Sequence, residues 1–141
     1  MDKETKRQII MDNYENPFNM EVPTNDEYIK VNYNNVNCID NIDLYILFDN
    51  NTIKDIRFGG EACAITTSST SIMIKNLIGK TIEDALTYIE NFENMIEEKD
   101  YDRDVLNDAI VYDEIYKQQN RKNCATLPYK AIKKVLMEKS K

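Results

Sequence analysis

The sequence contains no histidine. Without an imidazole, the chain cannot form a Ser-His or Cys-His catalytic pair, and a metal site built from its own side chains must use thiolates and carboxylates. No apolar run approaches the roughly 20 residues that span a bilayer. The polar residues 1–7 are not followed by an apolar stretch of signal-peptide length. We therefore expect a cytoplasmic protein with no membrane-spanning segment.

Basic residues are too few for a typical nucleic-acid-binding protein. The chain has 25 acidic and 18 basic residues, which gives a formal net charge of −7. Binding to nucleic-acid phosphates normally requires a basic face that displaces counterions. Here the acidic residues are spread along the chain. We therefore do not expect nucleic acid as a partner.

Cysteine is scarce, and the three cysteines are Cys38, Cys63 and Cys124. An odd number of cysteines cannot all be paired in disulfides within one chain. In a reducing cytosol, cysteines are more often buried apolar residues, metal ligands or nucleophiles. None of the three belongs to a Cys-x-x-Cys pair. Their spacing alone therefore gives a metal site only weak support.

The residue pattern of the N-terminal half predicts one helix and three strands. Apolar residues on one face indicate a helix over residues 3–14, which Asn16-Pro17 ends. β-forming residues predominate over residues 27–33, and apolar residues alternate strictly over residues 42–48. A third strand over residues 53–58 follows a turn at residues 49–51.

The C-terminal half predicts helices, over residues 65–78, 81–98, around 103–117 and 125–139. Gly79 is a typical residue for ending the first of them, and Pro128 falls in the first turn of the last one. The expected class is α+β, with an N-terminal helix, a three-stranded antiparallel sheet and then packed helices. A chain of 141 residues fits one domain spanning residues 1–141.

Each cysteine lies where a predicted element begins or ends. Cys38 precedes the second strand, whereas Cys63 and Cys124 precede helices. The positive end of a helix dipole favours the thiolate, which is both the nucleophile and the metal ligand. Taken alone, however, a loop cysteine is usually a small apolar residue, and Asp40 is usually a solvated acid. The Ser/Thr run over residues 66–71 is most simply a helix cap and a packing face.

Four motifs that follow one another along the chain favour a metal site over these simpler interpretations. They are the start Ile10-Met11-Asp12-Asn13-Tyr14-Glu15-Asn16-Pro17, the segment Asn37-Cys38-Ile39-Asp40-Asn41-Ile42, the segment Gly60-Glu61-Ala62-Cys63-Ala64-Ile65 and the segment Arg121-Lys122-Asn123-Cys124-Ala125-Thr126-Leu127. Together they resemble IscU/NifU-type iron–sulfur assembly proteins over nearly the whole chain. The sequence departs from the family pattern at Val36, Ile39 and Ala62, where the family usually has proline, glycine and glycine.

The resemblance is greatest to the SufU-like branch. The interval between Cys63 and Cys124 is long, as in SufU-like proteins, and Asn123 stands where the IscU branch typically has histidine. The resemblance implies a zinc site with the ligands Cys38, Asp40, Cys63 and Cys124. Arg121 is the cation that would support this negatively charged site. An iron–sulfur cluster is the alternative cofactor.

The resemblance also implies a function. SufU-like proteins accept sulfur from a cysteine desulfurase and pass it on to other iron–sulfur assembly proteins. We expect Cys124 to be the sulfur acceptor because it precedes a helix at the surface and follows Arg121-Lys122, with Cys38 as its rival. A scaffold on which a cluster is assembled and transferred is an alternative function, and a structural zinc domain is another.

Overall fold

The computed structural model describes residues 1–35 and 38–141. Val36 and Asn37, which the sequence analysis discussed as part of the first cysteine motif, lie outside the described residues. The elements are α1 (Lys3–Glu15), β1 (Ile29–Asn34), β2 (Asn41–Asp49), β3 (Thr52–Glu61), α2 (Ala64–Leu77), α3 (Ile82–Ile96), α4 (Arg103–Leu106), the 3-10 helices η1 (Asn107–Tyr112) and η2 (Ile115–Lys117), and α5 (Gln119–Lys139). The expected α+β class is confirmed.

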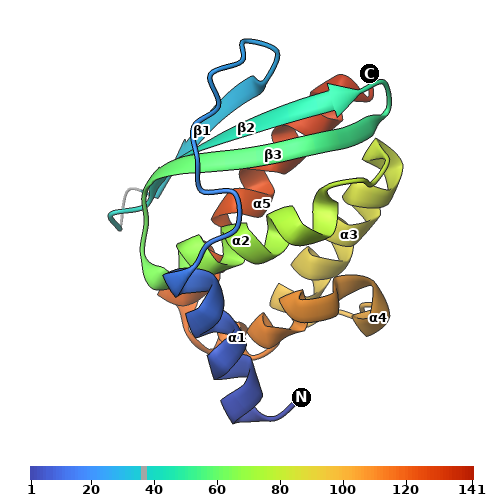
Figure 1. Cartoon of the computed structure of the whole chain (residues 1–141). Coiled ribbons are helices and arrows are strands. Elements are labelled where there is room, and N and C mark those ends of the chain that lie inside the picture. The colour runs from blue at the N-terminus through green and yellow to red at the C-terminus, as the bar shows by residue number, and fades with distance from the viewer. Residues whose placement is uncertain (36–37) are drawn as a thin grey trace.

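The three strands form one antiparallel sheet in the order β1-β2-β3. Alternation along β2 buries Ile42, Leu44 and Ile46, as the sequence predicted. Helices cover one face of this sheet, with α2 directly beneath it in Figure 1 and α5 behind α2. No helix in the described ranges is long and apolar enough to cross a membrane.

Helix α2 packs through an unusual row of small polar residues. All six residues from 66 to 71 are buried, and the side-chain hydroxyl of each makes a hydrogen bond. Ser71 Oγ donates to Asn13 Oδ1 of α1, and Ser69 Oγ donates to the Ala125 carbonyl of α5. Small side chains let the neighbouring helices approach α2 closely, and paired hydroxyls make this burial tolerable. The predicted packing face is confirmed.

Aromatic stacking joins the last helix to the rest of the core. The rings of Phe92 on α3 and Tyr129 on α5 stack with their centroids 3.8 Å apart, and Tyr88 lies parallel to Tyr129 on the same helix pair. All three rings are fully buried. This contact fixes the position of α5 and therefore of the cysteine near its start.

Two predicted helices differ from the structure. Residues 103–117 form the short helix α4 and two 3-10 turns, because Asn107 adopts a positive φ of 50° that interrupts an α-helix. Helix α5 begins at Gln119 and not at residue 125, so Pro128 lies inside the helix. The sequence argument placed Pro128 in the first turn, where proline is normally found.

Candidate metal centre

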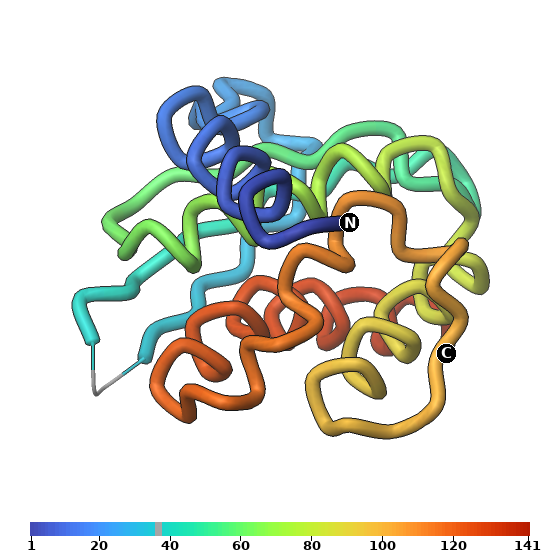
Figure 2. Tube along the Cα trace, turned by 90° about the horizontal axis from the view of Figure 1, so that it is seen from below, coloured from blue at the N-terminus to red at the C-terminus, as the bar shows by residue number. Residues whose placement is uncertain are grey.

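Three segments that are distant in sequence meet at one end of the molecule. Cys38 and Asp40 lie on the connection from β1 to β2, Cys63 is the N-cap of α2, and Cys124 lies in the second turn of α5. Figures 1 and 2 show the end of β1, the start of β2 and the starts of α2 and α5 at the same side of the molecule. One potential ligand atom from each of the four residues lies within 4.8 Å of all the others.

The register of the sheet brings the β1–β2 connection to α2. Asn41 pairs with Glu61 and Ile42 pairs with Gly60, so Asp40 is directly beside the end of β3 and the start of α2. Gly60 has a φ of +112°, and a Cβ there would lie 2.2 Å from the Asn41 carbonyl oxygen. Only glycine permits this close pairing of β2 with β3.

Asp40 is buried, and each of its two carboxylate oxygens accepts a hydrogen bond. Its Oδ1 accepts from the Cys63 backbone N–H at 2.8 Å, and its Oδ2 accepts from Thr66 Oγ1 at 2.6 Å. Burial alone would raise the pKa of Asp40. The hydrogen bonds from Thr66, the Cys63 N–H and the thiols of Cys124 and Cys63 outweigh burial and hold its pKa below the ordinary value. A carboxylate at a helix N-terminus is also favoured by the helix dipole.

The three cysteines differ in access to solvent. Cys38 is exposed, Cys63 is partly buried, and Cys124 is only 6% exposed. All three are free thiols. Burial, together with hydrogen bonds to Asp40 and Cys63, raises the pKa of the Cys124 thiol. Among the three cysteines, Cys38 has the sulfur that an incoming molecule can reach most easily.

The donor set fits a zinc ion. Four ligands at 2.0–2.3 Å from a tetrahedral Zn²⁺ lie about 3.3–3.8 Å from one another. The Cys63 Sγ to Asp40 Oδ2 distance is already 3.8 Å, and the largest separation in the cluster requires about 1 Å of closure. Three thiolates and one carboxylate suit zinc and also iron–sulfur clusters.

Residues 5–126 match the family model of the NifU-like N-terminal domain. The chain belongs to the NifU-like N-terminal domain family. This result confirms the resemblance that the cysteine motifs indicated.

Named relatives include both sulfur-transfer and scaffold proteins of this family. The chain is 40% identical over 129 residues to the zinc-dependent sulfurtransferase SufU of Bacillus subtilis, and the match covers 91% of this chain and 86% of SufU. It is 30% identical over 107 residues to the iron-sulfur cluster assembly scaffold protein IscU of Thermotoga maritima, covering 76% and 75%.

Solved structures have the same fold. A protein of Fervidobacterium islandicum, provisionally assigned as an iron-sulfur cluster assembly scaffold protein for the SUF system, superposes with a TM-score of 0.83 at 33% identity. That match covers 92% of this chain and 94% of the other. The N-terminal NifU-like protein of Brucella abortus also gives a TM-score of 0.83, at 15% identity, which shows the fold alone.

Several premises of the sequence argument for Cys124 are wrong. Helix α5 starts before this residue, so Cys124 is neither at a helix start nor at the surface. Cys124, and not Cys63, is the more deeply buried of the two. Lys122 pairs with Glu97 at 3.0 Å, and the exposed guanidinium of Arg121 makes no hydrogen bond or ion pair with any described residue. Cys124 as acceptor and Arg121 as supporting cation remain predictions.

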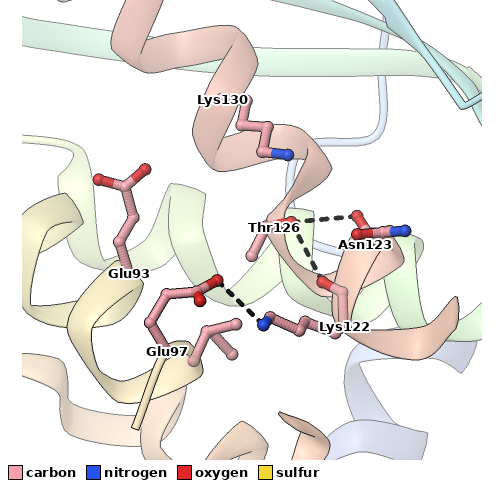
Figure 3. A pocket seen from close by; sticks show the side chains of 7 residues that line it. Glu93, Glu97, Lys122, Asn123, Thr126 and Lys130 are labelled. Carbon is pink, nitrogen blue, oxygen red and sulfur yellow. Dashed lines mark hydrogen bonds and ion pairs between the residues drawn. The ribbon is translucent and has the colours of Figure 1, made fainter. Parts of the chain in front are cut away.

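The Lys122–Glu97 ion pair crosses a small cavity between α3 and α5, shown in Figure 3. The cavity has a volume of about 110 Å³, and its lining includes Glu93, Asn123, Thr126 and Lys130. Thr126 Oγ1 lies 3.1 Å from the Lys122 carbonyl oxygen and 3.2 Å from the Asn123 carbonyl oxygen, and it can donate to one of them at a time. None of the four candidate ligands lines this cavity.

Thr66 is the residue that the sequence analysis missed. It was interpreted only as part of a cap and packing face, yet its hydroxyl contacts Asp40, Cys63 and the Cys124 carbonyl. The available signal was its position three residues after an N-cap cysteine, where a helix side chain points back toward the cap. That signal does not reveal Asp40 or Cys124, which reach Thr66 only through the tertiary fold.

Proposed function

We propose that this protein is a zinc-dependent sulfur acceptor that takes persulfide sulfur from a cysteine desulfurase and passes it into iron–sulfur cluster assembly. The observation that carries the proposal is the convergence of three thiols and one carboxylate within 4.8 Å, with one of the thiols exposed. The named activity of the Bacillus subtilis relative supports the same function. A reducing compartment such as the cytoplasm would keep the three cysteines as thiols.

Cys38 is the best-placed acceptor. Its thiolate attacks the terminal sulfur of the donor's persulfide and forms a new S–S bond. The S–S bond of the donor breaks, and the donor cysteine leaves as a thiolate, so sulfur moves without a change in the total number of disulfide-type bonds. The reaction requires access to a sulfur on another protein, and Cys38 is the exposed cysteine of the cluster. Cys124, which the sequence favoured, would have to become exposed first.

Zinc would be held by the four candidate ligands Cys38, Asp40, Cys63 and Cys124. A bound Zn²⁺ keeps its thiolate ligands deprotonated near neutral pH. Cys63 is the N-cap of α2 and its N–H donates to Asp40, so both ligands lie beside the N-terminus of this helix, whose partial positive charge suits anionic ligands. Cys38 is the exposed ligand, and its exchange would leave the three less exposed ligands in place.

A groove next to Cys38 offers a surface for the sulfur donor. It has a volume of about 500 Å³ and is lined by Tyr14, Pro17, Met20, Ile39 and Ala62, together with Glu15 and Glu61. Ile39 is 67% exposed and Met20 is 47% exposed. Exposed apolar side chains that adjoin a reactive residue are typical of a protein-binding surface. The two carboxylates favour a partner that combines an apolar anchor with basic residues.

A cluster-assembly scaffold is the second candidate function. It is favoured by the scaffold relative from Thermotoga maritima, which is 30% identical to this chain. The same thiolates can bind iron. Metal analysis of protein purified aerobically and anaerobically separates the functions: zinc in both preparations supports the sulfur acceptor, and iron with sulfide in the anaerobic one supports the scaffold.

The direct test is mass spectrometry after incubation with a cysteine desulfurase and cysteine. We expect a persulfide on Cys38, and loss of that modification in Cys38→Ser with the fold retained. A persulfide on Cys124 with Cys38 unmodified would restore the sequence-based assignment. Absence of sulfur from all three cysteines, in zinc-loaded protein that binds the desulfurase, would overturn the proposed function.

A further inference from the structure

The Thr66 hydroxyl lies among three of the four candidate ligands. Its Oγ1 is 2.6 Å from Asp40 Oδ2, 3.1 Å from the Cys124 carbonyl oxygen and 3.4 Å from Cys63 Sγ. The residue is completely buried. These three neighbours come from the β1–β2 connection, the start of α2 and helix α5. Thr66 therefore contacts every segment that supplies a candidate ligand.

One hydroxyl has one proton, so Thr66 can donate to only one acceptor at a time. The shortest distance and the negative charge favour Asp40, because hydrogen bonds to carboxylates are the stronger ones. The Cys124 carbonyl is a second possible acceptor, and Pro128 is the reason that it is available. In a regular helix the Cys124 carbonyl accepts from the N–H four residues later, but that residue is Pro128, which has none. The Thr66 hydroxyl is a donor within reach of this carbonyl.

We infer that Thr66 is a positioning residue for the metal centre, whose hydroxyl holds the Asp40 carboxylate in its ligating orientation. The inference rests on the proposed metal site. Partners that hydrogen-bond to a ligand fix its orientation and raise metal affinity. The Cys124 carbonyl gives the hydroxyl an alternative acceptor at 3.1 Å, so the Thr66 hydroxyl keeps a hydrogen-bond partner if the Asp40 carboxylate turns away from it. Thr66 could therefore both orient the Asp40 carboxylate and allow it to leave the metal.

Thr70 provides a matched control on the same helix. It is also a fully buried threonine, and its Oγ1 donates at 2.7 Å to the Thr66 carbonyl. Its hydroxyl contacts none of the four candidate ligands. Replacing either threonine with valine removes one buried hydroxyl and retains the side-chain shape. Only Thr66→Val removes a donor to the metal site.

The experiment measures zinc affinity by competition with a chromophoric chelator, in wild type, Thr66→Val, Thr66→Ser and Thr70→Val. Visible ligand-field spectra of the Co²⁺-substituted proteins report on the ligand geometry. We expect Thr66→Val to bind zinc roughly 10- to 100-fold more weakly than wild type and to have an altered Co²⁺ spectrum. Thr66→Ser should retain both properties, and Thr70→Val should bind zinc within about threefold of wild type.

A purely structural role would give a different pattern. Equal losses of zinc affinity in Thr66→Val and Thr70→Val, or in Thr66→Val and Thr66→Ser, would overturn the inference, as would wild-type affinity in Thr66→Val. If Thr66→Val does not fold, Thr66→Ala is compared with Thr66→Ser, since these two differ only by the hydroxyl. Failure of wild type to bind one zinc per chain would instead overturn the proposed metal site.

Discussion

Replacing Asp40 with alanine tests how the candidate site is built before any metal binds. The wild-type carboxylate accepts from two donors, the partly buried Cys63 N–H and the buried Thr66 hydroxyl. After the substitution, the Thr66 hydroxyl can turn to the Cys124 carbonyl at 3.1 Å. The Cys63 N–H then remains unpaired at the start of α2, and the helix loses a negative charge at its positive end.

These two losses set the expected magnitude. One unpaired buried donor destabilises a fold by about 1–3 kcal/mol, and the lost charge at the helix N-terminus adds about 0.3–1 kcal/mol. We therefore expect Asp40→Ala to lower the free energy of unfolding of the metal-free protein by about 1–4 kcal/mol. For a chain of this size, each kcal/mol corresponds to about 2–4 °C in melting temperature.

Urea denaturation followed by circular dichroism, with chelator present throughout, measures this change. Asp26→Ala is the matched control, because it removes the same charge from an exposed position. We expect that control to stay within about 0.5 kcal/mol of wild type. A similarly small change in Asp40→Ala would refute the reasoning, since it would mean that the buried carboxylate does not organise the start of α2.

Three further predictions address pH, backbone strain and partner binding. Because the folded-state pKa of Asp40 lies below its ordinary value of about 3.9, its stabilisation is complete above about pH 4 and is lost as the pH falls through the folded-state pKa. The stability difference between wild type and the isosteric Asp40→Asn, both metal-free, should therefore shrink on acidification, and a constant difference would contradict the lowered pKa. Gly60→Ala should destabilise the protein by about 3 kcal/mol or more through positive φ and a clash with the Asn41 carbonyl, whereas Gly79→Ala, with positive φ but open space, should lose only about 1–2 kcal/mol; equal losses in a urea titration would exclude the clash. Met20→Asp should weaken binding to a cysteine desulfurase in calorimetry by at least about tenfold, or roughly 1.4 kcal/mol, while Met137→Asp, which is 50% exposed near the end of α5, should bind as wild type does.

Local patterns predicted most of the secondary structure because they depend on neighbouring residues. Strict alternation placed β2, and the polar Thr81 start with an apolar stripe placed α3. Prediction failed at the start of α5, where the local preference of proline for a first turn conflicts with the packing of the whole helix. In the turn before Pro128, Ser69 Oγ donates to the Ala125 carbonyl, and the Thr66 hydroxyl lies within reach of the Cys124 carbonyl, so the interior proline is tolerated. Those donors are more than 50 residues away in sequence.

The sequence by itself determined the chemistry of the candidate site. The absence of histidine and the motifs around Cys38, Asp40, Cys63 and Cys124 restricted it to thiolates and one carboxylate, and the same motifs indicated the family. Only the tertiary structure decided which sulfur is accessible, how Asp40 can be buried as an anion and which hydroxyl holds it. Ligand identity is a property of each side chain, whereas exposure, pKa and hydrogen-bond partners depend on groups that folding brings together from distant segments.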